Sequence, residues 1–149
     1  MDLLTRKPIS IENLTRDADY PECGGLCTFS GIVRNHHEGR RVLKLQYTAY
    51  ESMAVRELKK LVDAIKQKYP ECRIRVQHRL GELQVGEVAI VIAVWAPHRH
   101  EAFAACETLM DAIKQRVPIW NKEFYADASN EWVICQHPAH QETKCQHAR

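Results

Sequence analysis

Basic side chains stand at both ends of one amphipathic segment, residues 98–117. His98 and Arg99 open it, and Lys114 lies on its last turn before Pro118. A helix start offers unpaired backbone N–H groups and a partial positive charge, so together with a guanidinium it suits a phosphate or a carboxylate. The alternative is a purely structural role for both groups. His98 and Arg99 would then form a solvated basic turn, and Lys114 would complement the helix dipole. An anion site is one of two open interpretations.

The separation of the two basic groups limits how they can act together. Lys114 follows Arg99 by fifteen residues, roughly 22 Å along an α-helix at about 1.5 Å per residue. No small ligand spans that distance. Either the helix carries two separate sites, or a second copy of the chain brings its His98–Arg99 pair to the Lys114 pocket of the first, as a two-fold dimer would do reciprocally.

Two further polar stretches hold candidate side chains. The loop 34–41 (RNHHEGRR) follows a glycine-containing strand, so Arg34 could lie over a ligand or the loop could face solvent. The C-terminal end carries zinc-type ligands spaced C-x-H-x2-H-x4-C-x-H, which matches no standard pattern. These residues are Cys135, His137, His140, Cys145 and His147. Either they bind a metal or they belong to a polar, His-rich tail.

Hydrophobic periodicity predicts the elements that position these groups. Alternation of apolar and polar residues indicates strands, and apolar residues three and four apart indicate helices. We expect strands at 24–33, 42–50, 72–80, 87–95, 119–125 and 132–135, helices at 51–69 and 98–117, and a turn at 81–86. A short helical turn capped by Ser10 precedes them. Short connections favour antiparallel pairing, so the chain is expected to be α+β, with two long helices on a mainly antiparallel sheet.

Several side chains are expected on buried faces of these elements. In the strand 42–50, Leu43 and Leu45 share the face predicted to be buried. In the strand 72–80, His78 alternates in phase with apolar neighbours. Met53 and Phe103 belong to the apolar stripes of the two helices.

Composition bounds the class of protein. The length of 149 residues fits one domain, which we place at 1–135, followed by a polar tail at 136–149. A net charge of +2 without a Lys/Arg block argues against nucleic acid. The longest apolar run, 88–96, is too short to span a membrane, and the N-terminus lacks a signal-peptide core. We therefore expect a soluble cytoplasmic protein with free thiols and no membrane partner.

Four motifs in a fixed order resemble the MoaE family, the large catalytic subunits of molybdopterin synthase. They are GIVRNHHEG at 31–39, RLGELQVGE at 79–87, APHRHEAF at 96–103 and MDAIKQRVPIWNKE at 110–123. The resemblance covers the chain from about Gly24 to Trp132. It implies an α/β-hammerhead fold and a central homodimer. A small ubiquitin-like MoaD subunit at each end would complete a heterotetramer.

The same resemblance implies a reaction. The C-terminal Gly-Gly of MoaD carries a thiocarboxylate and enters the MoaE pocket. Its sulfur is transferred to cyclic pyranopterin monophosphate (precursor Z) to build the dithiolene of molybdopterin. The large subunit contributes no metal or organic cofactor.

The resemblance also assigns residues. Arg34, His98 and Arg99 match substrate-binding positions, with the His-Arg pair reaching the pocket of the other subunit, and Lys114 matches a lysine essential for activity. The expected catalytic positions are Lys114, Asn121 and Lys122, and the expected substrate-binding positions add Ile32, Val33 and Glu123. Lys114 would stabilise the thiocarboxylate or its acyl intermediate, or transfer protons.

One position departs from the family. Members usually read P-x-W-K where this chain reads Pro118-Ile119-Trp120-Asn121, and that lysine is catalytically important. Asparagine keeps hydrogen bonding but carries no charge. Lys122 is adjacent, but neighbouring strand residues point to opposite faces, so it can substitute only through a bulge or a snorkelling side chain. The chain is therefore either a working synthase or an impaired subunit that binds MoaD and pterin without efficient turnover.

Overall fold

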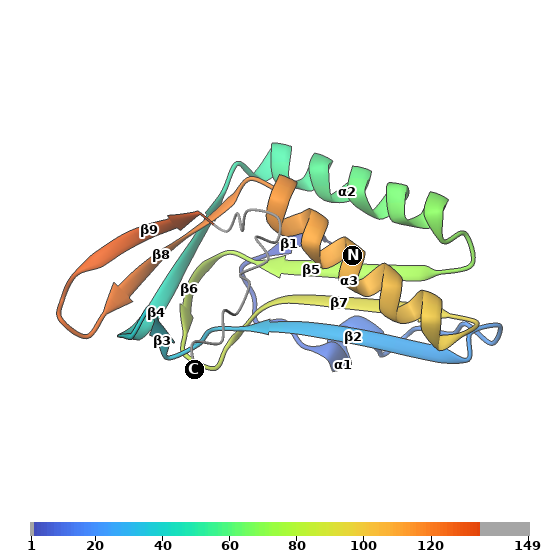
Figure 1. Ribbon diagram of the computed structural model, residues 1–149, viewed down its shortest axis with the longest axis horizontal. Coiled ribbons are helices and arrows are strands. Elements are labelled where there is room, and N and C mark those ends of the chain that lie inside the picture. Colours follow the sequence, from blue (N-terminus) through green and yellow to red (C-terminus); the bar gives the residue numbers. More distant parts are fainter. Residues whose placement is uncertain (1, 135–149) are drawn as a thin grey trace, which may run out of the picture.

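The computed structural model describes residues 2–134 of the chain (Figure 1). Within that range the elements are β1 (Leu4–Thr5), α1 (Ile11–Thr15), β2 (Gly25–Ile32), β3 (His36–His37), β4 (Arg40–Ala49), α2 (Glu51–Lys68), β5 (Arg73–Arg79), β6 (Gly81–Gln84), β7 (Val88–Ala96), α3 (Arg99–Arg116), β8 (Ile119–Tyr125) and β9 (Asn130–Ile134). The expected α+β class, with two long helices and mainly antiparallel strands, is confirmed. The expected boundary between domain and tail falls outside the described residues and stays a prediction.

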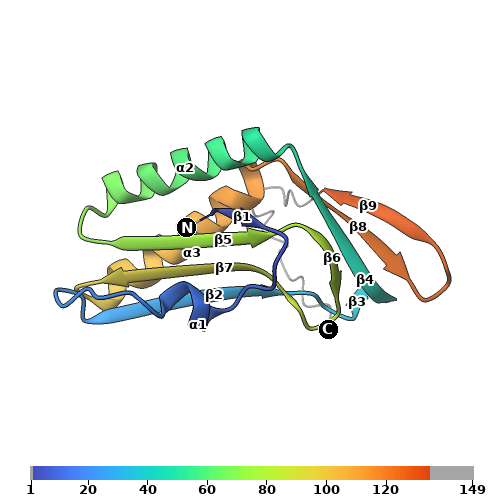
Figure 2. The ribbon, with the colours of Figure 1, turned by 180° about the vertical axis from the view of Figure 1, so that it is seen from behind.

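The first sheet has the strand order β1-β5-β7-β2 and carries the long helices. Helices α2 and α3 cover one face, and the short α1 lies on the other (Figures 1 and 2). Leu58 of α2, Leu109 of α3 and Ile92 of β7 are fully buried between them. Because β7 is covered on both faces, its sequence is a continuous apolar run rather than an alternating one.

The second sheet has the order β3-β4-β8-β9, with β6 also paired to β4, and it extends past the C-terminal end of α3 (Figure 1). A small core joins it to the first sheet, formed by Val33, Val42, Leu45, Leu83, Ala89 and Tyr125. The two sheets therefore meet at the end of α3, which is where Lys114 lies.

Three short strands were not predicted. The segment 81–86 was expected to be a turn, but β6 occupies Gly81–Gln84, and Leu83 within it is fully buried. β6 is held by pairing with β4, from Tyr47 opposite Gly81 to Lys44 opposite Gln84. β1 and β3 are each two residues long. Two residues are too few to show a periodicity, so neither the pairing of β1 with β5 nor the hairpin of β3 with β4 is revealed by the local pattern.

A bulge in β4 overturns one expected face. The register against β8 shifts between Val42 and Lys44. As a result Val42 and Leu45 are buried, whereas Leu43 is 47% exposed. The expectation that Leu43 and Leu45 share the buried face is wrong, because one extra residue in a strand reverses the alternation.

The buried faces of α2 and α3 contain smaller residues than the apolar pattern predicts. Met53 and Phe103, expected in the core, are 49% and 63% exposed. Ala54 and Ala102 are buried in their place, so the helix backbones approach the sheet closely. The expected cap at Ser10 is confirmed, since its Oγ accepts a hydrogen bond from the Asn13 backbone N–H at 3.1 Å. No helix among residues 2–134 is long and apolar enough to cross a membrane.

Candidate functional site

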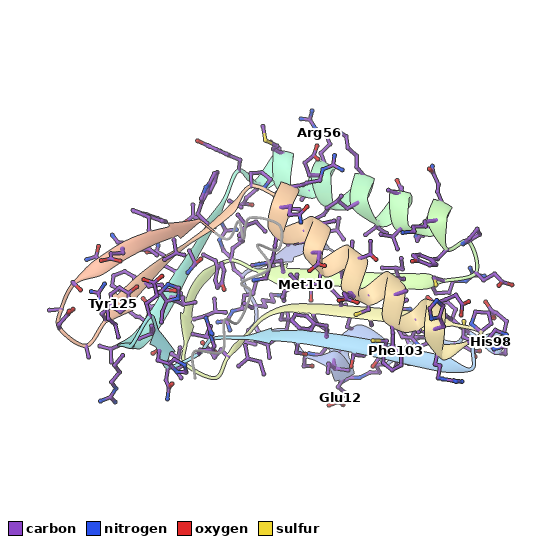
Figure 3. All side chains as sticks on the ribbon, viewed as in Figure 1. Glu12, Arg56, His98, Phe103, Met110 and Tyr125 are labelled. Atoms are coloured by element: carbon purple, nitrogen blue, oxygen red, sulfur yellow. The ribbon has the colours of Figure 1, made fainter. Side chains whose placement is uncertain are left out.

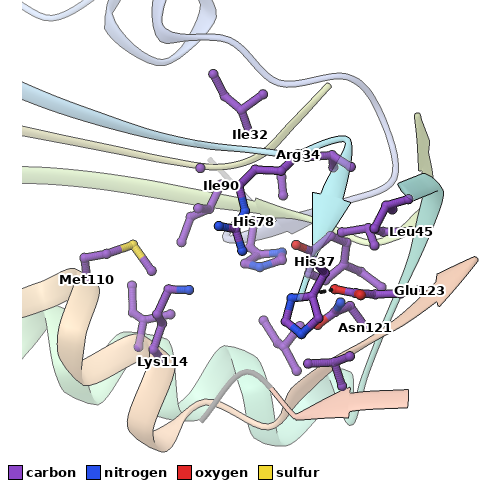
Figure 4. A pocket seen from close by; sticks show the side chains of 18 of the residues that line it. Ile32, Arg34, His37, Leu45, His78, Ile90, Met110, Lys114, Asn121 and Glu123 are labelled. Atoms are coloured by element: carbon purple, nitrogen blue, oxygen red, sulfur yellow. Dashed lines mark ion pairs between the residues drawn. The ribbon is translucent and has the colours of Figure 1, made fainter. Parts of the chain in front are cut away.

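A cavity of about 220 Å³ lies where the two sheets meet the C-terminal end of α3 (Figure 4). That volume is below the range typical of a complete small-molecule site. Its walls come from β2, β3, β4, β5, β7, α3, β8 and β9. The polar and charged side chains that line it are Arg34, His36, His37, Tyr47, His78, Lys114, Asn121 and Glu123.

The fold gathers residues from distant parts of the sequence into this cavity. Ile32 ends β2 and lines the cavity together with the buried Val33, and Arg34 follows them in the connection to β3. Lys114 stands on the last turn of α3. Arg34 and Lys114 are the arginine and the lysine among the described lining residues, so the cavity is suited to an anion.

Glu123 is the buried acid of the cavity. Its side chain is held by Tyr125, whose hydroxyl donates a hydrogen bond to Glu123 Oε2 at 2.6 Å. Burial, followed by the neighbouring Glu123 carboxylate, raises the pKa of Tyr125 to about 12, so the phenol keeps the proton that it donates. His37 lies on the other side, with Nδ1 at 3.8 Å from Glu123 Oε1 (Figure 4).

His78 lines the cavity as a buried imidazole. Its Nδ1 donates a hydrogen bond to the Arg79 carbonyl oxygen at 2.8 Å, which leaves Nε2 as the acceptor nitrogen. The ring packs edge-on against Tyr47 at 5.1 Å between centroids. Burial, with a smaller contribution from the Lys114 charge, lowers the pKa of His78 to about 4. The side chain is therefore neutral at physiological pH.

Asn121 and Lys122 lie on opposite faces of β8. Asn121 is buried, lines the cavity and stands opposite Tyr47 in the ladder with β4. The Lys122 ammonium lies over the aromatic rings of Phe124 and Trp132, at 5.5 Å and 5.4 Å from their centroids. The expected alternation is confirmed, and the structure does not bring Lys122 to the cavity.

His98 and Arg99 lie at the opposite end of α3 from the cavity (Figure 3). Both side chains are exposed, and His98 occupies the N-cap position without a side-chain capping hydrogen bond. Within one protomer the structure therefore unites Ile32, Val33, Arg34, Lys114, Asn121 and Glu123, but not the His98–Arg99 pair.

No group of three metal-ligating side chains occurs within residues 2–134. The alternative metal ligands Cys135, His137, His140 and Cys145 lie outside the described residues. Cys23, Cys27, Cys72 and Cys106 are free thiols, as expected.

Sequence reasoning missed His78 as a site residue. It was placed on the inward side of its strand, among apolar neighbours. Its position on the inward side of an alternating strand could have identified it, because a buried imidazole needs a hydrogen-bond partner and a neutral state. Met110 and Tyr47, which also line the cavity, carry no comparable signal.

The fold and the site together define an α+β protein with a cavity between two sheets that is lined by Arg34 and Lys114. The model of the "MoaE protein" family matches residues 4–116. The chain therefore belongs to the MoaE family, and the expected family is confirmed.

Several curated relatives are named molybdopterin synthase catalytic subunits. The molybdopterin synthase catalytic subunit of Nostoc is 40% identical over 131 residues, covering 87% of this chain and 79% of that protein. Molybdopterin synthase catalytic subunit 1 of Mycobacterium tuberculosis is 42% identical, with 87% and 88% covered. The human molybdopterin synthase catalytic subunit is 39% identical, with 84% and 66% covered.

Solved structures agree with the fold. Molybdopterin synthase from Staphylococcus aureus superposes with a TM-score of 0.82 at 35% identity, covering 87% of this chain and 94% of that one. A MoaE protein from Burkholderia ambifaria gives a TM-score of 0.72 at 27% identity, with 90% and 88% covered.

Proposed function

We propose that this chain is the catalytic subunit of a molybdopterin synthase, a sulfurtransferase of molybdenum cofactor biosynthesis. Sulfur passes from a thiocarboxylate on the C-terminal Gly-Gly of a MoaD-like partner to cyclic pyranopterin monophosphate. The observation that carries the proposal is the convergence of Arg34 and Lys114 on one cavity in a chain of the MoaE family. Both the phosphate and the thiocarboxylate are anions, and each needs a cation in a partly enclosed site.

The residue roles follow from position. Arg34 lines the cavity and binds the phosphate or pterin oxygens, while Ile32 and Val33 form part of the cavity wall. Lys114 meets the thiocarboxylate and stabilises the charge that develops as sulfur leaves its acyl carbon. Asn121 and Glu123 contact the substrate from β8. A catalytic part for Lys122 requires its ammonium to leave the rings of Phe124 and Trp132.

The active assembly is a homodimer within a heterotetramer with MoaD-like subunits. The 18-residue length of α3 supports sharing of the site, because His98 and Arg99 lie a full helix away from Lys114. The partner protomer's His98–Arg99 pair would complete the small cavity. The reaction uses no resident cofactor, and we place the protein in the cytoplasm as a single domain through residue 135.

A second candidate function rests on Asn121. The cavity lacks a lysine at this position, so the chain could bind MoaD and the pterin without efficient turnover. The test is a sulfur-transfer assay with purified protein, thiocarboxylated MoaD and cyclic pyranopterin monophosphate, in which the dithiolene product is measured. Formation of the dithiolene product over repeated turnovers supports the assignment as a catalytic subunit. Binding of both ligands without product supports the impaired subunit, and the absence of binding refutes both.

A further inference from the structure

His37 stands between the cavity and solvent. It lies on β3, in a tight hairpin whose turn residues Glu38 and Gly39 both have positive φ. Its side chain is 27% exposed and lines the cavity. This location gives the imidazole access both to a bound ligand and to solvent protons.

A fixed carboxylate faces the ring. Glu123 Oε1 lies 3.8 Å from His37 Nδ1, and Glu123 Oε2 accepts the 2.6 Å hydrogen bond from Tyr125. Tyr125 is itself held, because the Arg40 guanidinium lies 3.6 Å over its ring. Arg40 in turn donates a 2.7 Å hydrogen bond to Glu131 on β9. The carboxylate that faces His37 therefore has a defined orientation.

The charges around His37 have opposing signs. Two carboxylates lie near the ring, with Glu123 Oε1 at 3.8 Å from Nδ1 and Glu38 Oε1 at 3.7 Å from Nε2. Glu38 is 84% exposed, so water screens it, whereas Glu123 is buried. The other titratable or charged groups lining the cavity are Arg34, His36, His78 and Lys114. Arg34 and Lys114 are the arginine and the lysine among them.

We propose that His37 is a general acid–base residue of this cavity, with Glu123 and Tyr125 as its positioning residues. The proposal rests on the proposed sulfur transfer. As the transferred sulfur forms a C–S bond at a carbon of the bound pterin phosphate, the C–O bond of that carbon breaks and its electron pair stays on the leaving oxygen. The imidazolium N–H bond breaks, and its proton forms the new O–H bond. The neutral ring then takes a proton from solvent.

A histidine with a hydrogen-bonded carboxylate behind it is a recurrent proton-transfer unit, because the carboxylate orients the ring and stabilises the imidazolium. The separation of 3.8 Å is longer than a hydrogen bond, and such contacts commonly tighten only when the ligand is bound. His78 is less suited to this work. Its burial and its lowered pKa of about 4 keep it neutral.

The test is the pH dependence of kcat in single-turnover assays of the assembled complex with the MoaD-like partner. We expect His37→Gln to lower kcat about a hundredfold and to remove one ionisation in the pH range where histidines titrate. Tyr125→Phe, which removes only the hydroxyl that orients Glu123, should lower kcat about tenfold with KM within twofold, a loss at the low end of general acid–base contributions.

Glu38→Gln is the matched control, since it removes the exposed carboxylate near the other ring nitrogen and should leave both kcat and the pH profile unchanged. Circular dichroism and thermal unfolding establish that each variant is folded. If wild type is active and folded His37→Gln keeps its rate and its pH profile, the inference is overturned while the proposed function stands. An inactive wild type that binds its ligands would instead remove the proposed function itself.

Discussion

Arg99 and Lys114 occupy opposite ends of the 18-residue helix α3, and only Lys114 lines the cavity. At about 1.5 Å per residue the helix separates them by roughly 22 Å. One protomer therefore cannot place both groups on one small substrate. The same geometry makes sharing between protomers testable.

A mixed dimer provides that test. One chain carries Arg99→Ala and the other Lys114→Ala, so a shared arrangement leaves one intact site per dimer. We expect about half of the wild-type activity in the mixed dimer. Each homodimer of a single variant should be inactive and serves as the control. An inactive mixed dimer would show that both residues act within one protomer.

The second prediction concerns the charge missing at Asn121. Its side chain is buried and lines the cavity, so a lysine there would add a cation facing the substrate. We expect Asn121→Lys to raise kcat for dithiolene formation about tenfold, which corresponds to about 1.4 kcal/mol of transition-state stabilisation.

Asn121→Gln lengthens the side chain without adding charge and separates size from electrostatics. An increase with lysine alone identifies the charge as the missing factor. Equal rates in wild type and Asn121→Lys would mean that other groups already supply it.

The buried His78 predicts how stability depends on pH. Burial lowers its pKa to about 4 in the folded protein, against 6.5 for an exposed histidine. Below about pH 6.5 the unfolded chain binds a proton that the folded chain does not. Stability is therefore full above that pH and falls as the pH drops toward 4. The expected loss from this group between pH 7 and pH 5 is about 2 kcal/mol.

Urea unfolding at both pH values measures the effect. His78→Gln keeps a polar side chain but does not titrate. The difference in unfolding free energy between pH 7 and pH 5 should therefore be about 2 kcal/mol smaller in this variant than in wild type. An unchanged difference between pH 7 and pH 5 in the variant would assign the pH dependence to other groups.

The bulge in β4 gives a prediction about two neighbouring leucines. Leu45 is 7% exposed and belongs to the core that joins the sheets, whereas Leu43 is 47% exposed. Leu45→Ala should lower the free energy of unfolding by about 2–5 kcal/mol, because it leaves a cavity. Leu43→Ala should cost less than about 1 kcal/mol. Denaturant titrations of the two variants make the comparison, and equal losses would contradict the bulge.

Much of the architecture was predictable because periodicity is a local property. The helices at 51–69 and 98–117 and the strands at 72–80 and 119–125 lie within a few residues of α2, α3, β5 and β8. Pro70 and Pro118 end the helices at the positions where proline prevents their continuation. Strand alternation was also sufficient to place Asn121 and Lys122 on opposite faces.

The errors have one physical origin. β6 is stabilised by pairing with β4, Leu43 is turned outward by a bulge opposite β8, and Phe103 is displaced from the core by alanines that pack closely on the sheet. Each depends on a partner far away in the sequence. No window of neighbouring residues contains that information.

The sequence by itself determined the α+β class, the family and the residue types that can bind two anions. It also determined that Arg99 and Lys114 cannot meet within one chain, because helix length follows from residue count alone. Only the tertiary structure decided that Glu123 faces His37, that Tyr125 holds it, and that His78 is buried beside Lys114. Those relationships arise where two sheets converge on a helix end, and distance in space there is independent of distance along the chain.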